Sequence, residues 1–350
     1  MNFETLLERL TKKAGDVDAQ SAWPTQQLDD MAQADVLGWV IPKEFGGTDI
    51  SAAELSEGYE KLATACLATT FVLTQRNGAC QRIVTSQNES LKAELLPKLV
   101  SGEIFATVGI SHLTTSRQHL KKPAVEVELH DDSVTMNGLM PWVTGAEFAD
   151  YIVTGGTASN GEQVLVALPT KSAGVQVNPP AKLMALTGSY TTSVVLENVS
   201  VSRSHLLAGP IENVMSQGTG GGAGSLTTSA LAIGLCQRAL NMLQQESQRR
   251  DNLQTPASQF ADILSKLRSD FYLLANGQEP NNTVNPQSIR QRANSLALRI
   301  TQAALAATKG AGFLQGHPAE LAVREAMFFL VWSCPQPVVD GVLAELACSD

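Results

Sequence analysis

Apolar residues at three- to four-residue spacing mark the first part of the chain as helical. Leu6 and Leu10 share one face of an N-terminal helix. The sequence IPKEFGG at residues 41–47 is a turn signal. Asp49 and Ser51 follow it as candidate N-caps, because a side-chain oxygen there can accept from free backbone N–H groups. We expect helices over residues 52–63, 67–83 and 89–99.

Residues 104–205 change to alternating apolar and polar positions, the pattern of half-buried strands. The clearest run is AVEVEL at residues 124–129. The run VTM at residues 134–136 leads into Asn137-Gly138, a dipeptide typical of hairpin turns. Short strands separated by Gly, Asn and Asp predict an antiparallel barrel or sandwich. Further strands are expected at residues 151–153, 164–168, 192–196 and 199–201.

Helical spacing returns after residue 226. The order of helices, strands and helices predicts an α+β multidomain chain. We expect a helical N-terminal domain over residues 1–103, a middle β-domain over 104–210 and a helical C-terminal domain over 211–350. Within the last domain, helices are expected over residues 231–240, 260–274, 288–309, 319–332 and 338–346.

Composition excludes several classes of function. The net charge is -9 and no Lys/Arg-rich run exists, which argues against nucleic acid as a partner. The first residues lack the basic and apolar regions of a signal peptide, and no run of 18 apolar residues predicts a membrane span. The 5 cysteines are odd in number and lack CxxC spacing, so we expect no metal site and a reducing, cytoplasmic location. Only 17% of residues are charged, which suggests a surface partly buried in an oligomer.

The glycine-rich run GTGGGAGS at residues 218–225 invites comparison with a phosphate-binding loop. No strong strand leads into it, and no Gly-Lys-Ser/Thr follows. We interpret it as a flexible hinge before a helix.

Five segments occur in an order that points to one family. They are LGWVIPKEFGG at residues 37–47, LLPKLVSGE at 95–103, NGLMPWVTGAEFAD at 137–150, LENV and LLAG within 196–209, and KGAGF, HPAE and REA within 309–326. Together they resemble the acyl-CoA dehydrogenase superfamily over roughly residues 30–340. The resemblance implies a helical N-terminal domain, a middle β-barrel and a C-terminal four-helix bundle.

The resemblance also implies a cofactor and partners. It implies FAD bound partly across a subunit interface of a homodimer or homotetramer. It further implies acyl-CoA or another acyl thioester as the ligand, and an electron-transfer flavoprotein as a possible redox partner. An FAD-dependent α,β-dehydrogenation of an acyl thioester is therefore the expected reaction.

Two positions in the third segment are the best candidates for flavin contact. By resemblance, Trp142 excludes water beside the flavin, and Thr144 supplies a hydroxyl or backbone N–H at the atom that accepts the hydride. Without the resemblance, a buried tryptophan in a barrel turn with a threonine bonded locally explains the same residues.

Three further positions resemble the family's cofactor contacts. Arg250 in RDNL resembles the arginine that meets the FAD pyrophosphate of a neighbouring subunit, with a solvated helix end as the alternative. Gly310 and Gly312 would let backbone approach a phosphate or adenosine group. Ala306 stands where the family has a glutamine, which weakens the case for tight FAD binding.

The entrance to the β-domain departs from the family pattern of Thr-Glu-Pro and Gly-Ser-Asp. Ser111, Ser116 and Arg117 are the polar residues there that would touch FAD or substrate. A solvated polar loop explains them equally well.

The catalytic base of the family has no counterpart here. Dehydrogenation needs a carboxylate beside the α-carbon, with a pKa raised by desolvation. Counting from the REA segment places Ser333 at the usual glutamate position, and the alternative position at the start of the bundle falls on Gly224. Cys334 would substitute only as a thiolate. Glu212 and Glu325 are acids that would have to reach in from elsewhere.

Three interpretations therefore remain open from the sequence. The first is a dehydrogenase-type flavoenzyme with a displaced or unusual base. The second is a flavin-dependent monooxygenase on the same fold, whose chemistry does not need this glutamate. The third is a non-catalytic binding protein that retained the fold.

Overall fold

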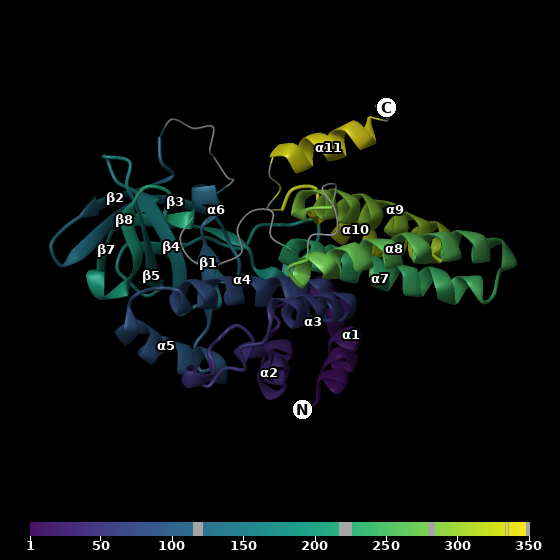
Figure 1. Ribbon diagram of the computed structural model, residues 1–350, viewed down its shortest axis with the longest axis horizontal. Helices are drawn as coiled ribbons and strands as arrows, with labels where there is room; N and C mark the ends of the chain where they lie inside the picture. The colour runs from purple at the N-terminus through teal and green to yellow at the C-terminus, as the bar shows by residue number, and fades with distance from the viewer. Residues whose placement is uncertain (115–121, 217–225, 279–283, 333, 335, 348–350) are drawn as a thin grey trace.

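The computed structural model describes residues 1–114, 122–216, 226–278, 284–332, 334 and 336–347 (Figure 1). The predicted order of a helical region, a sheet and a second helical region is confirmed. In Figure 1 the sheet lies at one end of the molecule, the C-terminal helices extend from the other, and the N-terminal helices run beneath both. The glycine run at residues 218–225 lies outside the described residues.

The N-terminal region contains the three helices expected from periodicity. Ser51 is the N-cap of the first: its hydroxyl accepts from Glu54 N, and the Glu54 carboxylate accepts from Ser51 N at 2.8 Å. Asp49 precedes this capping box with a positive φ of 49° and is not the cap. The helices of this region are α1 (Phe3–Ala19), α2 (Thr25–Gln33), α3 (Ala52–Ala65), α4 (Leu67–Val84), α5 (Glu89–Ser101) and the short α6 (Ser111–Thr114).

The middle region is one 8-stranded sheet in the described chain, with the order β6-β7-β3-β2-β4-β5-β8 and β1 paired with β4. The middle β-domain is confirmed, but its barrel is loose: in the described chain the strand path ends at β6 and β8 without pairing between them, so the sheet is not closed. The sheet is also mixed, since β1 and β2 meet β4 in parallel. The strands are β1 (Ala106–Gly109), β2 (Val125–Leu129), β3 (Ser133–Val143), β4 (Tyr151–Thr157), β5 (Gln163–Pro169), β6 (Val175–Val177), β7 (Thr192–Ser202) and β8 (Leu206–Ile211).

Asn137-Gly138 is not the hairpin turn that its sequence suggested. Both residues lie inside β3, at a break in the register between β3 and β7. Gly138 has a φ of 137°, and a Cβ there would lie 2.1 Å from the Ala124 carbonyl oxygen. The glycine is needed for a β-bulge and a close approach of two backbones.

The C-terminal helices α7 to α10 pack against one another as the bundle, and α11 lies outside them (Figure 1). Helix α7 also crosses α3, where a Cβ on Gly234 would lie 2.5 Å from the Glu60 carbonyl oxygen. One hydrophobic core runs through the N-terminal helices and the bundle, while the sheet has a core of its own. The helices are α7 (Leu226–Ser247), α8 (Gln254–Ala275), α9 (Pro286–Gly312), α10 (Pro318–Phe328) and α11 (Gln336–Leu346).

Helix α10 is shorter than its apolar pattern suggested. We expected helix to residue 332, but α10 ends at Phe328 and turns follow it. Among the described residues, no helix has the length and apolarity needed to cross a bilayer.

Candidate cofactor and active site

Trp142 and Thr144 lie where β3 ends and the chain turns back. The Trp142 side chain is 52% exposed, although large aromatic side chains are usually covered. Thr144 is buried, and its hydroxyl lies 3.0 Å from that of Thr191, which lies 2.8 Å from the Ser189 hydroxyl. Gly145 then adopts a φ of 63°, which allows the turn. The end of β3 thus carries an exposed aromatic side chain and, two residues later, the first of three linked hydroxyl groups.

The entrance to the sheet domain contains hydroxyl groups without partners. Ser111 begins α6, directly after β1, and its Oγ is buried with no hydrogen-bond partner in the described chain. Thr107 Oγ1 on β1 is also buried with no hydrogen-bond partner in the described chain. Buried hydroxyls normally have partners, so these groups are consistent with a ligand at this edge. Ser116 and Arg117 lie outside the described residues.

His112 joins α6 to the sheet. Its Nε2 is 2.9 Å from the Gly155 carbonyl oxygen. Burial lowers the pKa of the imidazole, and the bond to Gly155 partly opposes that effect. The side chain is therefore neutral at pH 7 and supports the fold of α6 against β4.

Arg250 lies at the junction between α7 and α8. Its Nη2 contacts both the Glu246 carboxylate and the Ala307 carbonyl oxygen, and its side chain is 24% exposed. Both contacts use one nitrogen, so Nε and Nη1 remain for other acceptors. The contact with Ala307 brings Arg250 to the last turns of α9.

Gly310 and Gly312 are in those last turns. A Cβ on Gly310 would meet nothing within 4 Å, whereas one on Gly312 would lie 1.9 Å from Thr308 Oγ1. Lys309 interrupts the helix with a φ of 56° and a ψ of -148°. Ala306, at the family's glutamine position, is exposed.

The structure thus divides the predicted cofactor residues into two groups. Ser111, Trp142 and Thr144 belong to the sheet domain, whereas Arg250 and the end of α9 belong to the bundle. Figure 1 shows the α7–α8 connection at the end of the bundle farthest from the sheet. The candidate residues therefore form two separate groups within one chain, here called the sheet half-site and the bundle half-site.

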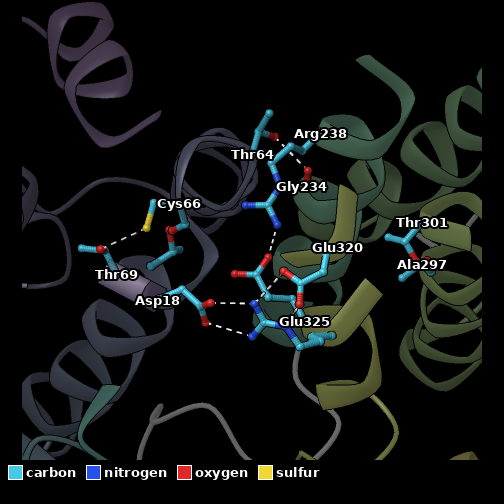
Figure 2. A network of polar contacts seen from close by, with 12 residues as sticks. Asp18, Thr64, Cys66, Thr69, Gly234, Arg238, Ala297, Thr301, Glu320 and Glu325 are labelled. Carbon is cyan, nitrogen blue, oxygen red and sulfur yellow. Dashed lines mark hydrogen bonds and ion pairs between the residues drawn. The ribbon is translucent and has the colours of Figure 1, made fainter. Parts of the chain in front are cut away.

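The two acids considered as substitutes for the base lie in different environments. Glu325 is 3% exposed and forms an ion pair with Arg238 of α7, as Figure 2 shows. Burial lowers the pKa of the Arg238 guanidinium to about 10. Glu212 is exposed, just after β8. Neither acid is placed to act as a desolvated base. Ser333 and Gly224 lie outside the described residues.

Cys334 lies in the segment between α10 and α11. Its Sγ is 3.2 Å from the Phe329 carbonyl oxygen and 3.4 Å from that of Trp332. Arg290 Nη2 lies 3.7 Å from the same sulfur. No local pattern predicts this cation, because 44 residues separate Arg290 from the cysteine. The only available signal was that Arg290 falls on the apolar face of α9, with Ala293 and Ala297.

Comparison with known proteins agrees with this architecture. Residues 4–103 match the family profile "Acyl-CoA dehydrogenase, N-terminal domain". A "Probable acyl-CoA dehydrogenase YngJ" of Bacillus subtilis (strain 168) is 25% identical, over 91% of this chain and 88% of the relative.

Two solved structures have the same fold. A glutaryl-coenzyme A dehydrogenase in complex with glutaryl-CoA superimposes with a TM-score of 0.82 at 20% identity, covering 99% of this chain and 97% of the other. The dibenzothiophene monooxygenase TdsC of Paenibacillus sp. A11-2 gives 0.81 at 18%, covering 97% and 93%.

The helical, sheet and helical regions therefore define the acyl-CoA dehydrogenase fold. Residues 4–103 carry the N-terminal domain of the acyl-CoA dehydrogenases, and the rest of the chain resembles enzymes of the same superfamily.

Proposed function

We propose that this chain is an FAD-dependent oxidoreductase that acts on an acyl thioester. The observation that carries the proposal is the exposed Trp142 ring at the end of β3, two residues before Thr144 and its hydroxyl contact with Thr191. Ser111, which follows β1, adds a buried hydroxyl without a partner in the described chain. FAD, when bound, supplies a group that accepts two electrons from the substrate. The chain itself has to bind, orient and shield that group.

The residues present fit a flavin on both half-sites. The unpartnered Ser111 Oγ needs an acceptor or donor that the described chain does not supply. Among the described residues, Arg250 uses only Nη2 for its contacts, and its other two guanidinium nitrogens would suit a pyrophosphate. Gly310 leaves open space where any side chain would stand. The exposed Ala306 supplies no polar contact, so this end would hold the cofactor more weakly than a glutamine would.

Each residue of the sheet half-site has a separate task in this proposal. Trp142 would cover one face of the ring system and exclude water. Thr144 would direct its hydroxyl or backbone N–H to the hydride-accepting end, and its bond to Thr191 fixes the rotamer. Ser111 would contact the polar edge of the same ring.

The separation of the half-sites supports a homodimer or homotetramer in which Arg250 serves the cofactor of a partner copy. The names of two similar proteins support the substrate class. One is a probable acyl-CoA dehydrogenase, and the other is a glutaryl-coenzyme A dehydrogenase bound to glutaryl-CoA. An electron-transfer flavoprotein would be the redox partner of such an enzyme.

A second candidate is a flavin-dependent monooxygenase on the same fold. It is favoured by the pairing of Glu325 with Arg238, because that ion pair removes one of the two acids considered as substitute bases from proton transfer. The fold likeness to dibenzothiophene monooxygenase is consistent with this candidate. A non-catalytic binding protein would instead fail to hold FAD.

The test is an anaerobic titration of FAD-loaded protein with a series of acyl-CoAs. Loss of the visible flavin band means that the substrate reduces the flavin, as dehydrogenation requires. A bound flavin that no thioester bleaches refutes dehydrogenation, and oxygen uptake by the reduced protein then favours the monooxygenase. Absence of FAD binding would refute both.

A matched pair of variants tests the half-site itself. Thr144→Val should weaken FAD binding about tenfold, the loss of one hydrogen bond of about 1.4 kcal/mol. Thr135→Val makes the same change within β3, the strand that leads to Thr144, and among the described residues its hydroxyl contacts only His130. Equal affinities for the two variants would contradict the proposed contact.

A further inference from the structure

Two buried polar side chains of α9 hold the segment that follows α10. Arg290 and Asn294 are both 0% exposed. Arg290 Nη2 donates to the Trp332 carbonyl oxygen at 2.7 Å, and Asn294 Nδ2 donates to that of Phe329 at 2.9 Å. The guanidinium carbon also lies 6.0 Å from the ring centres of Phe329 and Trp332. The segment is therefore fixed over the cation.

The Cys334 thiol joins the same cluster. Its sulfur approaches the two carbonyl oxygens that α9 already contacts, and it lies 3.7 Å from Arg290 Nη2. As a thiol, the group donates to one of these carbonyls. Once the sulfur carries negative charge or an added oxygen, it becomes an acceptor, and Arg290 is the donor beside it.

Arg290 lacks an anion. Its Nε and Nη1 are buried and have no hydrogen-bond partner in the described chain, and no carboxylate contacts it there. Burial lowers the pKa of the guanidinium, as expected for an uncompensated cation. Asn294 Oδ1 is likewise unpartnered. A buried cation with unused donors is costly, and an anionic oxygen nearby would lower that cost.

We propose that Cys334 is a site of oxidation by a peroxide, and that Arg290 holds the oxidised sulfur. In the first step the sulfur attacks one oxygen of hydrogen peroxide, the O–O bond breaks, and the thiol and peroxide become sulfenic acid and water. The sulfur loses two electrons and the peroxide gains them. The sulfenic acid then releases its proton to solvent as the sulfenate, and a second peroxide converts it to the sulfinate. Each added oxygen reaches donors that the sulfur alone does not contact.

The other described cysteines are internal controls. Cys66, Cys80 and Cys236 are free and buried, whereas Cys334 is half-buried. Burial raises the pKa of the Cys80 and Cys236 thiols, which makes them inert. Cys334 thus combines access with a neighbouring cation, the environment of oxidisable cysteines.

The experiment treats the full chain with hydrogen peroxide in the presence of dimedone, which traps sulfenic acids, and locates the adducts by peptide mass spectrometry. Cys348 lies outside the described residues and is replaced by serine in every protein compared. We expect labelling of Cys334 at least ten times faster than that of the three buried cysteines. Arg290→Met should slow it about tenfold, or about 1.4 kcal/mol. Arg292→Met, on the same helix but paired with Asp270, should leave it unchanged.

A comparison within the unmodified fold covers the case in which Arg290→Met does not fold. In urea the chain unfolds, all cysteines become exposed, and Cys334 loses its contact with Arg290. Native labelling of Cys334 faster than its own labelling in urea supports the proposal. Native labelling that is slower than in urea, or equal among the cysteines, overturns it. So does a folded Arg290→Met protein that labels at the original rate.

Discussion

Glu325→Ala should strongly destabilise the protein, because it leaves a buried cation alone. Glu325 is 3% exposed and its partner Arg238 is 14% exposed. Arg238 Nε is already buried without a partner, so the carboxylate is the main compensation for this charge. The pair joins α7 to α10, and Figure 2 shows the two side chains facing each other.

Breaking one partner of a buried pair typically costs about 3–5 kcal/mol. The neighbouring Asp18–Arg324 pair is the control, since its side chains are 14% and 23% exposed and Arg324 also bonds Glu320. Asp18→Asn should cost about 1 kcal/mol or less. The double variant Glu325→Leu/Arg238→Leu should recover much of the loss, because it removes both charges together.

Urea unfolding followed by far-UV circular dichroism measures these differences. If Glu325→Ala costs no more than Asp18→Asn, the buried pair does not contribute as its geometry indicates. A different refutation would come from activity: loss of flavin bleaching with unchanged stability would make Glu325 a catalytic acid or base.

Three further changes test the sheet domain. Thr191→Val removes both hydroxyl contacts of the Thr144 site, so it should cost about 1–3 kcal/mol and weaken FAD binding; unchanged flavin affinity in a titration would refute the positioning role. Burial depresses the pKa of His112 in the folded state, so the unfolded chain binds more protons below about pH 6.5. The free energy of unfolding should therefore fall as the pH decreases from that value, by up to about 1.4 kcal/mol per pH unit. His112→Gln should lose this component, and urea midpoints that keep the same pH dependence would contradict it. Gly109→Ala places a Cβ 2.9 Å from Met140 Sδ and should cost about 1–3 kcal/mol, whereas Gly78→Ala meets nothing closer than 3.5 Å and should not lower the melting temperature.

Local patterns predicted the helices well because the determinants are local. Ser51 and Glu54 form a capping box whose two bonds involve only residues three apart. The sheet was harder, because its edges depend on partners distant in sequence. Asn137-Gly138 has the composition of a turn, yet its positive φ serves a bulge against the Ala124 carbonyl. Composition alone does not distinguish these two uses of glycine.

The candidate site was predictable only in part for the same reason. The Trp142–Thr144 motif is contiguous, so the sequence identified it. Thr191, which fixes the Thr144 hydroxyl, comes 47 residues later and carries no local signal. Likewise, α10 ends early, before a segment whose carbonyl groups accept hydrogen bonds from α9. Asn294 donates to the Phe329 carbonyl and Arg290 to the Trp332 carbonyl. The helical spacing of apolar residues does not predict these contacts.

The division of the site has a consequence for function. The sheet half-site offers a ring-binding face and hydroxyl groups but, among its described residues, no cation that contacts it. The bundle half-site offers Arg250 and the open space beside Gly310. Among its described residues, the exposed aromatic side chain is that of Phe313, which is 80% exposed. A dinucleotide needs both kinds of contact at once, and the α7–α8 connection, which contains Arg250, lies at the end of the bundle far from the sheet (Figure 1). Cofactor affinity should therefore depend on protein concentration, because only a second copy of the chain would bring Arg250 to the ring held by Trp142.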